Sequence, residues 1–481
     1  MSKQLQAMKT CAATGAYLLI TGAAAGAYLL MSSVASAAVT AEEAKKLGTT
    51  LTEFGAEKGA NADGSIPAYT GGITKMPDGY TKGADQYVDP FKDDKPLYSI
   101  DAKNAAQYDT LLTVGDKAMM AAFPTYRVDV YPTRRSVSYP SWYLENGVKN
   151  ATTTTMVGDV EGDALKGAAA DGLPFPGVPF PIPKSGYEVM WNHKTNFGPP
   201  IHHQFVKGFL IDASGSILSL AEPNTYYIRP WADKTGKLRK ETYNGIFGFS
   251  SKLMSPPSSA GIHFLNYYMP SAEDGGQKVW FYTPGQRRVR AAPEFSYDIP
   301  IAAYGGVLFW DEVYGFVGRM DRFNFKLMGK KEIIVPYNVY GATNQMLSKD
   351  FIGPKHMTPE SVRYEKRRVW VVDATRKEGA RHAYSRRTFY VEEDCTCVVA
   401  ADAYDNGGKL WRVGKFLTFP TYDVGGIANP AMYITDLNKG NYTALNIGAK
   451  DEGHFQRSYT STDGLPGLQL TPQAVSAGSV R

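Results

Sequence analysis

The sequence predicts a mainly β protein built on antiparallel sheet, with a small number of packed helices. From about Gln204 onward, apolar and polar residues alternate with a period of two, which is typical of strands with one buried face. Turn residues recur at short intervals here without long intervening helices, so neighbouring strands are expected to pair antiparallel. The chain has 31 tyrosines but only 7 histidines and 3 cysteines, as expected for a large β-rich protein.

Length and composition restrict the class of protein further. The 481 residues are 43% hydrophobic and 21% charged, near globular averages, which excludes a disordered, collagen-like or coiled-coil chain. The length allows one large domain or two to three ordinary ones. A formal net charge of +5 is too small to indicate a nucleic-acid-binding protein, so no nucleic acid partner is predicted.

The first 37 residues have the layout of a secretory signal peptide. Lys3 and Lys9 give a basic start, an apolar stretch covers residues 12–34, and Ala35-Ser36-Ala37 supplies small residues for cleavage near Ala37. An uncleaved membrane anchor is the alternative, because the apolar stretch is rather long. For a Gram-negative source we expect a periplasmic protein, either free or peripheral to the outer membrane.

Residues 38–200 are expected to form helices and long loops that wrap a sheet formed by residues 201–481, the two regions together making one domain. Thr40 and Glu43 make a capping box for a first short helix. Further helices are predicted over residues 104–112, 115–123 and about 187–194. The proline-rich residues 173–183 are expected to lie extended, since proline is excluded from helix interiors and central strands.

Strands and hairpins are predicted throughout the second half of the chain. One hairpin is expected to run from residues 323–327 through a turn at Gly329-Lys330 and back through residues 333–335. Other strands are predicted over residues 279–283, 287–290, 368–374, 388–392, 396–404 and 410–419. The last of these is apolar on both faces, so it is expected to be covered on both sides by helices, another sheet or a bound ligand.

The usual catalytic motifs are missing from the sequence. It contains no G-x-S-x-G, no H-E-x-x-H, no P-loop and no G-x-G-x-x-G after a strand. Only His202 and His203 are close together, and adjacent side chains in an extended segment point to opposite faces. No catalytic residue, metal site or cofactor is therefore predicted.

Cys395-Thr396-Cys397 allows three interpretations. In a strand both sulfurs face the same side, with the two Cα atoms ~6.5–7 Å apart, at the upper limit for a disulfide. The pair could be two small buried thiols, a strained disulfide, or a soft-metal or redox site. The flanking Val399, Ala401 and Ala403 form a small apolar face, which favours buried thiols.

Seven residues are candidates for ligand contact, on motif density and chemistry. Arg287, Arg288 and Arg290 could bind anionic headgroups or carboxylates. They could instead form an exposed strand face paired with acids such as Glu294, Asp298 or Asp311. Trp191, Trp310 and Trp411 could line a cavity, or each could be ordinary core. His193, in the motif of residues 188–193, completes the set.

Several segments together resemble an exported Gram-negative family, domain-of-unknown-function family 1329, often labelled outer-membrane lipoprotein-sorting proteins. The matching segments, which span almost the whole mature length, are residues 131–135, 179–183, 188–193, 284–293, 297–298, 329–332, 335–338, 404–405 and 410–413. Their order and number carry the resemblance, since each segment alone is a weak signal.

The resemblance implies a fold similar to the LolA and LolB carriers. Such a fold is a large, curved, incompletely closed antiparallel sheet, a half-barrel, wrapped around helices, with an apolar cavity for acyl chains. It also implies an association with outer-membrane proteins and with resistance-nodulation-division (RND) exporters. The family provides no catalytic residues to transfer to this chain.

Three functions follow as hypotheses. The first is a non-enzymatic periplasmic carrier or accessory protein for a hydrophobic ligand such as a lipid, a sterol-like compound or an acylated protein. The second is an assembly module for an outer-membrane protein or exporter, and the third is an exported enzyme acting on a lipid-like substrate. The carrier hypothesis requires a sheet whose inner face is lined with apolar side chains and left open to a ligand.

Overall fold

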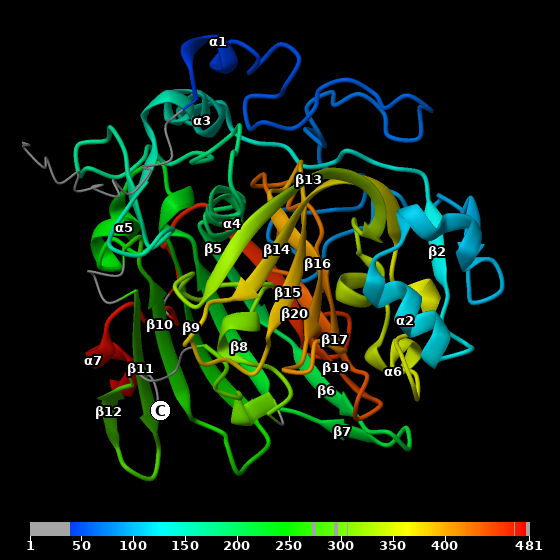
Figure 1. Ribbon diagram of the computed structural model, residues 1–481. Helices are drawn as coiled ribbons and strands as arrows, with labels where there is room; N and C mark the ends of the chain where they lie inside the picture. The colour runs from blue at the N-terminus through cyan, green and yellow to red at the C-terminus, as the bar shows by residue number, and fades with distance from the viewer. Residues whose placement is uncertain (1–38, 272–275, 293–296, 305, 466, 478–481) are drawn as a thin grey trace, which may run out of the picture. The chain divides into compact units, whose positions relative to one another are not determined.

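The computed structural model describes residues 39–271, 276–292, 297–304, 306–465 and 467–477 (Figure 1). The expected signal peptide, residues 1–37, lies outside the described residues. Within them, no helix is both long enough and apolar enough to span a bilayer.

The described residues form an eleven-stranded sheet, the large sheet, drawn mainly in yellow and orange in Figure 1. Its order is β1 (Tyr98–Ile100), β2 (Val128–Tyr131), β14 (Tyr364–Arg376), β15 (Arg386–Glu392), β16 (Cys397–Tyr404), β17 (Leu410–Leu417), β18 (Ala431–Asp436), β19 (Asn441–Ile447), β6 (Lys207–Ile211) and β7 (Ile217–Ser219). Strand β13 (Phe323–Pro336) also pairs with β14. All these pairs are antiparallel except β2 with β14, which is parallel.

A seven-stranded antiparallel sheet, the small sheet, is mostly green in Figure 1. Its order is β12 (Arg288–Ala291), β11 (Gln277–Thr283), β10 (His263–Tyr268), β9 (Phe247–Ser255), β8 (Glu222–Ile228), β5 (Ile201–Phe205) and β20 (Phe455–Tyr459). Only Val206, fully buried, separates β5 from β6, so one stretch of chain passes from the small sheet into the large one. A short hairpin joins β3 (Thr155–Val157) and β4 (Ala164–Lys166).

The predicted fold class is confirmed, since the chain is mainly β and its large antiparallel sheets do not close into a barrel. The helices are α1 (Ala41–Ala44), α2 (Val114–Ala122), α3 (Ser141–Thr153), α4 (Gly186–Lys194), α5 (Lys237–Glu241), α6 (Ser348–Phe351) and α7 (Pro472–Ala477). Short 3-10 or π turns are η1 (Ala105–Leu111), η2 (Pro230–Ala232), η3 (Ala302–Tyr304), η4 (Trp310–Glu312), η5 (Gly341–Gln345) and η6 (Pro359–Ser361). The capping box at Thr40 and Glu43 is present.

The predicted hairpin around Gly329 is wrong. Residues 323–336 form one long strand, β13, and both of its halves pair with β14. The register shifts between Leu327 and Lys330, and Gly329 has a φ of 101°. Gly329 therefore makes a β-bulge within one strand, where the sequence pattern had predicted a turn between two.

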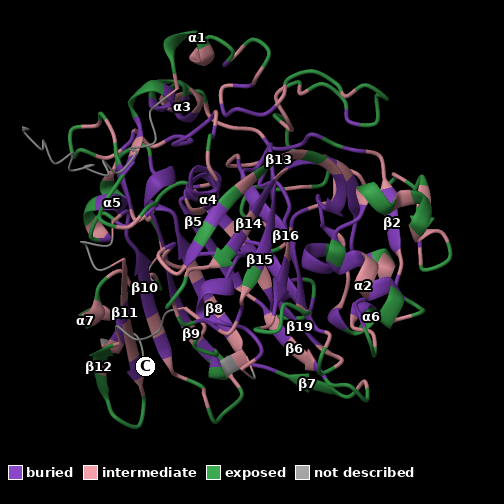
Figure 2. Ribbon diagram, in the orientation of Figure 1, coloured by how far each residue is buried: buried purple, intermediate pink, exposed green. Residues whose placement is uncertain are grey.

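A layer of chain lies between the two sheets and fills most of the space there. It consists of α4, purple along nearly its whole length in Figure 2, and residues 297–304 and 306–320, here called the inserted segment. Trp310 and Tyr314 contact Phe249 and Tyr227 of the small sheet, at ring-centroid distances of 6.4 and 5.2 Å. Phe316 contacts Phe389 of the large sheet at 5.7 Å.

Buried ion pairs attach the N-terminal half of the chain to the large sheet. Arg135 and Arg367 both contact Asp394 at 2.6 Å, and Arg367 also contacts Glu392 at 2.6 Å. These side chains are at most 2% exposed. Arg135 follows β2 whereas Arg367 lies on β14, so the shared carboxylate joins segments far apart in sequence.

Asp394→Asn is predicted to lower the free energy of unfolding by ~3–5 kcal/mol, because it removes the buried carboxylate that Arg135 and Arg367 share and leaves Arg135 only the more distant Glu393, at 3.5 Å. Urea denaturation monitored by tyrosine and tryptophan fluorescence measures this change. Glu42→Gln is the matched control, since Glu42 pairs with Lys45 at 2.6 Å between side chains that are 80% and 71% exposed. The control is expected to change stability little, and equal losses in the two variants would contradict the structural role of Asp394.

Candidate ligand-binding site

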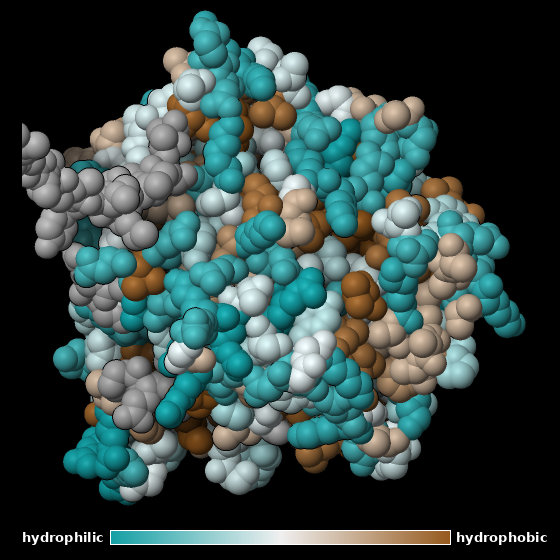
Figure 3. All heavy atoms as spheres, in the orientation of Figure 1, coloured by the Kyte–Doolittle hydropathy of each residue, from teal (hydrophilic) through white to brown (hydrophobic). Residues whose placement is uncertain are grey.

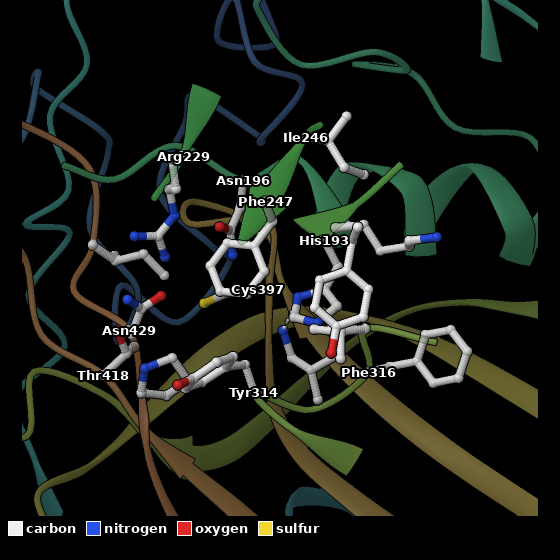
Figure 4. Close-up of a pocket in the computed structure, with 16 residues that line it drawn as sticks. His193, Asn196, Arg229, Ile246, Phe247, Tyr314, Phe316, Cys397, Thr418 and Asn429 are labelled. Atoms are coloured by element: carbon white, nitrogen blue, oxygen red, sulfur yellow. Dashed lines mark hydrogen bonds between the residues drawn. The ribbon is translucent and has the colours of Figure 1, made fainter. Parts of the chain in front are cut away.

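An apolar cavity lies where both sheets, α4 and the inserted segment meet (Figure 4). The small sheet contributes Phe247, the inserted segment Tyr314 and Phe316, α4 His193, and the large sheet Val398. The volume open to the centres of water molecules is about 30 Å³, which is room for about two waters. The space that was expected to be open to a ligand is thus largely filled by the protein's own side chains.

Two further cavities adjoin this one. The first, of about 170 Å³, shares Lys194, Tyr268 and Val317 with it and has a more polar lining. The second, of about 50 Å³, shares Tyr314 and is also lined by Trp310. The inserted segment therefore divides the space between the sheets into separate small volumes.

Arg229, directly after β8, carries a cationic side chain into the central cavity. The residue is 4% exposed, and its Nη1 has no hydrogen-bond partner among the described residues. No described carboxylate oxygen lies within 4.0 Å of the guanidinium, whose Cζ is 5.8 Å from the ring centroid of Phe247. Burial lowers the pKa of Arg229 to about 10, so the side chain stays charged at neutral pH.

Asn429 supplies a second polar group without a partner in the same cavity. It is 3% exposed, and its Nδ2 has no hydrogen-bond partner among the described residues. In Figure 4, Arg229, Asn429 and Thr418 are seen on one side of the cavity, with His193 and Phe316 on the other. The cavity therefore has a polar end, formed by Arg229, Asn429 and Thr418, whereas its other side combines the Phe316 ring with His193.

His193 and Lys194, at the end of α4, are both affected by burial. His193 Nδ1 accepts a hydrogen bond from the Val398 amide at 3.1 Å, and burial lowers the pKa of His193 to about 3. Lys194 Nζ lies 4.1 Å from the ring centroid of Trp191. Burial also lowers the pKa of Lys194, to about 8, although Asp163 opposes the shift.

Of the seven candidate residues, His193 is the one that lines the central cavity. Trp191 is buried in α4, where its Nε1 donates to the Gly162 carbonyl at 2.9 Å. Trp310 lines the 50 Å³ cavity. Trp411 lies half-buried on β17, where its Nε1 donates to Asp436 at 2.9 Å.

The three candidate arginines do not line the central cavity; they are Arg287, Arg288 and Arg290. They lie exposed in the β11–β12 turn and on β12, the end strand of the small sheet. Two of the acids weighed as their partners bind other bases, because Asp311 contacts Arg387 at 2.7 Å and Asp298 contacts Arg322 at 3.5 Å.

The sequence analysis missed Arg229, Phe247 and Asn429. Arg229 stands in the otherwise apolar and aromatic stretch Tyr226-Tyr227-Ile228-Arg229-Pro230-Trp231. A lone charge in such surroundings is a signal that could have identified it, because the apolar residues around it are expected to be buried and a charge among them needs a partner.

The structure contains a disulfide between Cys395 and Cys397. The two Cα atoms are 5.2 Å apart, closer than the strand spacing assumed in the sequence analysis. That assumption was wrong because a turn precedes β16 and Thr396 has a φ of 50°. Cys397 lines the central cavity. Among the residues that the structure describes, no group of three or more His, Cys, Asp or Glu side chains could hold a metal ion.

The buried, neutral His193 predicts a loss of stability in acid. In the unfolded chain its pKa returns to about 6.5, so between pH 6.5 and 3 the unfolded state binds a proton that the folded state does not. Unfolding becomes more favourable as the pH falls, by about 2 kcal/mol at pH 5 for this one group. Denaturation at pH 7 and pH 5 should show a smaller pH effect for His193→Gln than for the parent protein. Equal pH effects would contradict the assignment.

Comparisons with known proteins agree with the sequence resemblance. The family described as protein of unknown function (DUF1329) matches residues 99–476. An uncharacterized protein of Pseudomonas aeruginosa is 35% identical over 449 residues, covering 92% of this chain and 95% of that protein. A solved DUF1329 family structure from Desulfovibrio piger has a TM-score of 0.38 and 15% identity, covering 60% of this chain and 97% of the other. A LolA superfamily protein of Nitrosomonas europaea has a TM-score of 0.32 and 11% identity, covering 55% and 91%. This chain belongs to the DUF1329 family.

Proposed function

We propose that this protein is a non-enzymatic carrier or accessory protein that binds a hydrophobic ligand between its two sheets. The observation that carries the proposal is the central cavity, where apolar side chains from both sheets and from the inserted segment face unfilled space. An apolar ligand that crosses water must be shielded, and burial stabilises it by ~25 cal/mol per Å² of apolar surface.

Ligand entry requires the inserted segment to move, because 30 Å³ is far below the ~300–1,000 Å³ of ordinary ligand sites. The backbone of this segment is bonded mainly to itself. Examples are the Ile301 amide to the Leu308 carbonyl at 2.8 Å and the Trp310 amide to the Ile299 carbonyl at 3.2 Å. Among the described residues, none of its backbone groups hydrogen-bonds to the backbone of a strand in either sheet. Displacement would therefore leave both ladders of backbone hydrogen bonds intact.

Side-chain contacts anchor the inserted segment to the large sheet. Asp311 contacts His382 at 3.0 Å and Arg387 at 2.7 Å, while Glu312 contacts Arg412 at 3.1 Å. The Arg387 and His382 side chains hold the pKa of Asp311 well below its usual range, against the effect of burial. These contacts hold the segment in place when no ligand is bound.

The finer parts of the proposal rest on the N-terminal segment and on the family resemblance. We propose a periplasmic location after cleavage near Ala37, and a ligand that is a lipid, a sterol-like compound or an acylated protein. Exchange of the ligand with an outer-membrane protein or an RND-type exporter is part of the same proposal.

Val398→Trp is predicted to weaken ligand uptake at least tenfold, because the larger side chain fills space in the cavity that Val398 lines. Titration with the fluorescent apolar probe N-phenyl-1-naphthylamine measures uptake, and native mass spectrometry of the protein purified from periplasm detects any lipid that remains bound. Ile217→Trp is the matched control, since Ile217 is 56% exposed on β7. Probe binding that is equal in the two variants would place the ligand elsewhere.

An assembly module is the second candidate function, favoured by the outer edge of the large sheet. Ile217 and Leu218 are 56% and 57% exposed on β7, the end strand of that sheet. Exposed strand edges can pair with a strand of another protein. On the face drawn in Figure 3, hydrophobic residues form small groups separated by hydrophilic ones, so a docking partner would contact an edge in preference to a broad patch on that face.

Replacing both Ile217 and Leu218 by lysine is predicted to abolish co-purification of a partner if this protein is an assembly module, because lysine on an edge strand opposes pairing. Affinity purification from periplasm, followed by mass spectrometry, makes the measurement. The same double variant should retain probe binding if the protein is a carrier. A partner that survives the double substitution would exclude β7 as the docking edge.

A further inference from the structure

Among the described residues, every buried arginine except Arg229 has a carboxylate partner. Eight arginines are at most 9% exposed among the described residues: Arg135, Arg229, Arg239, Arg363, Arg367, Arg368, Arg387 and Arg412. Seven of them have a carboxylate within 4.0 Å. Arg229 has none in the part of the chain that the structure describes. A buried charge without a counter-charge is strongly disfavoured in a folded protein, so this exception requires an explanation.

The space around the guanidinium is shaped by its neighbours. A Cβ atom added to Gly198 would come within 2.7 Å of Arg229 Nη1 and 2.3 Å of the Ile427 carbonyl oxygen. Any side chain larger than hydrogen at position 198 would therefore displace Arg229 or the chain beside it. The guanidinium thus lies between the backbone at Gly198 and the Phe247 ring, and neither provides an acidic group.

The unsatisfied groups at the polar end of the cavity are hydrogen-bond donors. They are Nη1 of Arg229 and Nδ2 of Asn429. His193 does not offset the charge of Arg229. Its ring is neutral at physiological pH, and its Nδ1 already accepts a hydrogen bond from the Val398 amide. A ligand group that satisfies both donors must present hydrogen-bond acceptors, and an anionic group with oxygen acceptors would also neutralise Arg229.

We propose that Arg229 and Asn429 bind the anionic headgroup of an amphipathic ligand, whose hydrocarbon chain lies against Phe247 and Phe316 after the inserted segment moves. The proposal rests on the carrier function and names the class of its ligand. A carboxylate and a phosphate share the required chemistry, because each offers at least two oxygens to a guanidinium. A fatty acid or the phosphate group of a phospholipid could supply it.

Ligands that share one chain length and differ only in the headgroup test the proposal on the unmodified protein. Dodecanoate, dodecyl phosphate, lauroyl lysophosphatidylglycerol, dodecanol and dodecyltrimethylammonium are each titrated, below their critical micelle concentrations, against bound N-phenyl-1-naphthylamine. At least one of the three anions is expected to displace the probe about tenfold more strongly than dodecanol, and the cation least. Preference for dodecanoate identifies a carboxylate ligand, and preference for either phosphate compound identifies a phosphate ligand.

Variants of Arg229 then test whether this residue causes the preference for anions. Arg229→Met keeps the length of the side chain and removes its charge, so it is expected to abolish the preference for anions while dodecanol still binds. Arg229→Lys keeps the charge with fewer donors and is expected to retain part of the preference. Arg288→Met is the matched control, because Arg288 is exposed on β12, and it should leave the preference unchanged.

The outcomes separate the headgroup proposal from the carrier function. Equal binding of the anions and dodecanol by the unmodified protein would overturn the headgroup site and leave the carrier function standing. Lack of binding by every compound, dodecanol included, would overturn both. A preference for anions that persists in Arg229→Met but disappears in Arg288→Met would move the headgroup site to β12. If Arg229→Met does not fold, the headgroup series on the unmodified protein and on Arg229→Lys still shows whether the protein prefers anionic headgroups.

Discussion

Burial of apolar side chains between two open sheets is the interaction on which the rest of this structure depends. Neither sheet closes on itself, so each has an inner face that must be covered. The cover is a layer made of α4 and the inserted segment, with Tyr314 against the small sheet and Phe316 against the large one. The surfaces that hold the protein together are therefore the same surfaces that a hydrophobic ligand would contact.

Charge is distributed unequally across this interior. The inserted segment brings Asp311 and Glu312 to Arg387 and Arg412 of the large sheet. It brings no carboxylate to Arg229, at the end of β8 in the small sheet. The carboxylates of the inserted segment thus neutralise arginines of the large sheet, while Arg229 beside the small sheet keeps an uncompensated charge that faces the central cavity.

The strands and the family could be predicted from sequence because their signals are local. Alternating apolar residues and the turn at residues 405–408 located β16 and β17 to within one or two residues. Gly329 was misinterpreted because a bulge and a turn both place glycine between apolar runs. The site was largely missed for a different reason. The absence of a partner for Arg229 is a property of the folded chain, whereas the conspicuous arginine cluster at residues 287–290 lies on an exposed edge.

The passage of one stretch of chain from β5 into β6 has a consequence for the order in which the molecule can assemble. Strand β5 pairs with β20, where His202 and Ser458 are 256 positions apart, and β6 pairs with β19. Both sheets thus receive a neighbouring strand from the last tenth of the polypeptide. A chain emerging from its N-terminus would hold two incomplete edges until residues 441–459 have been synthesised, so folding is expected to be slow.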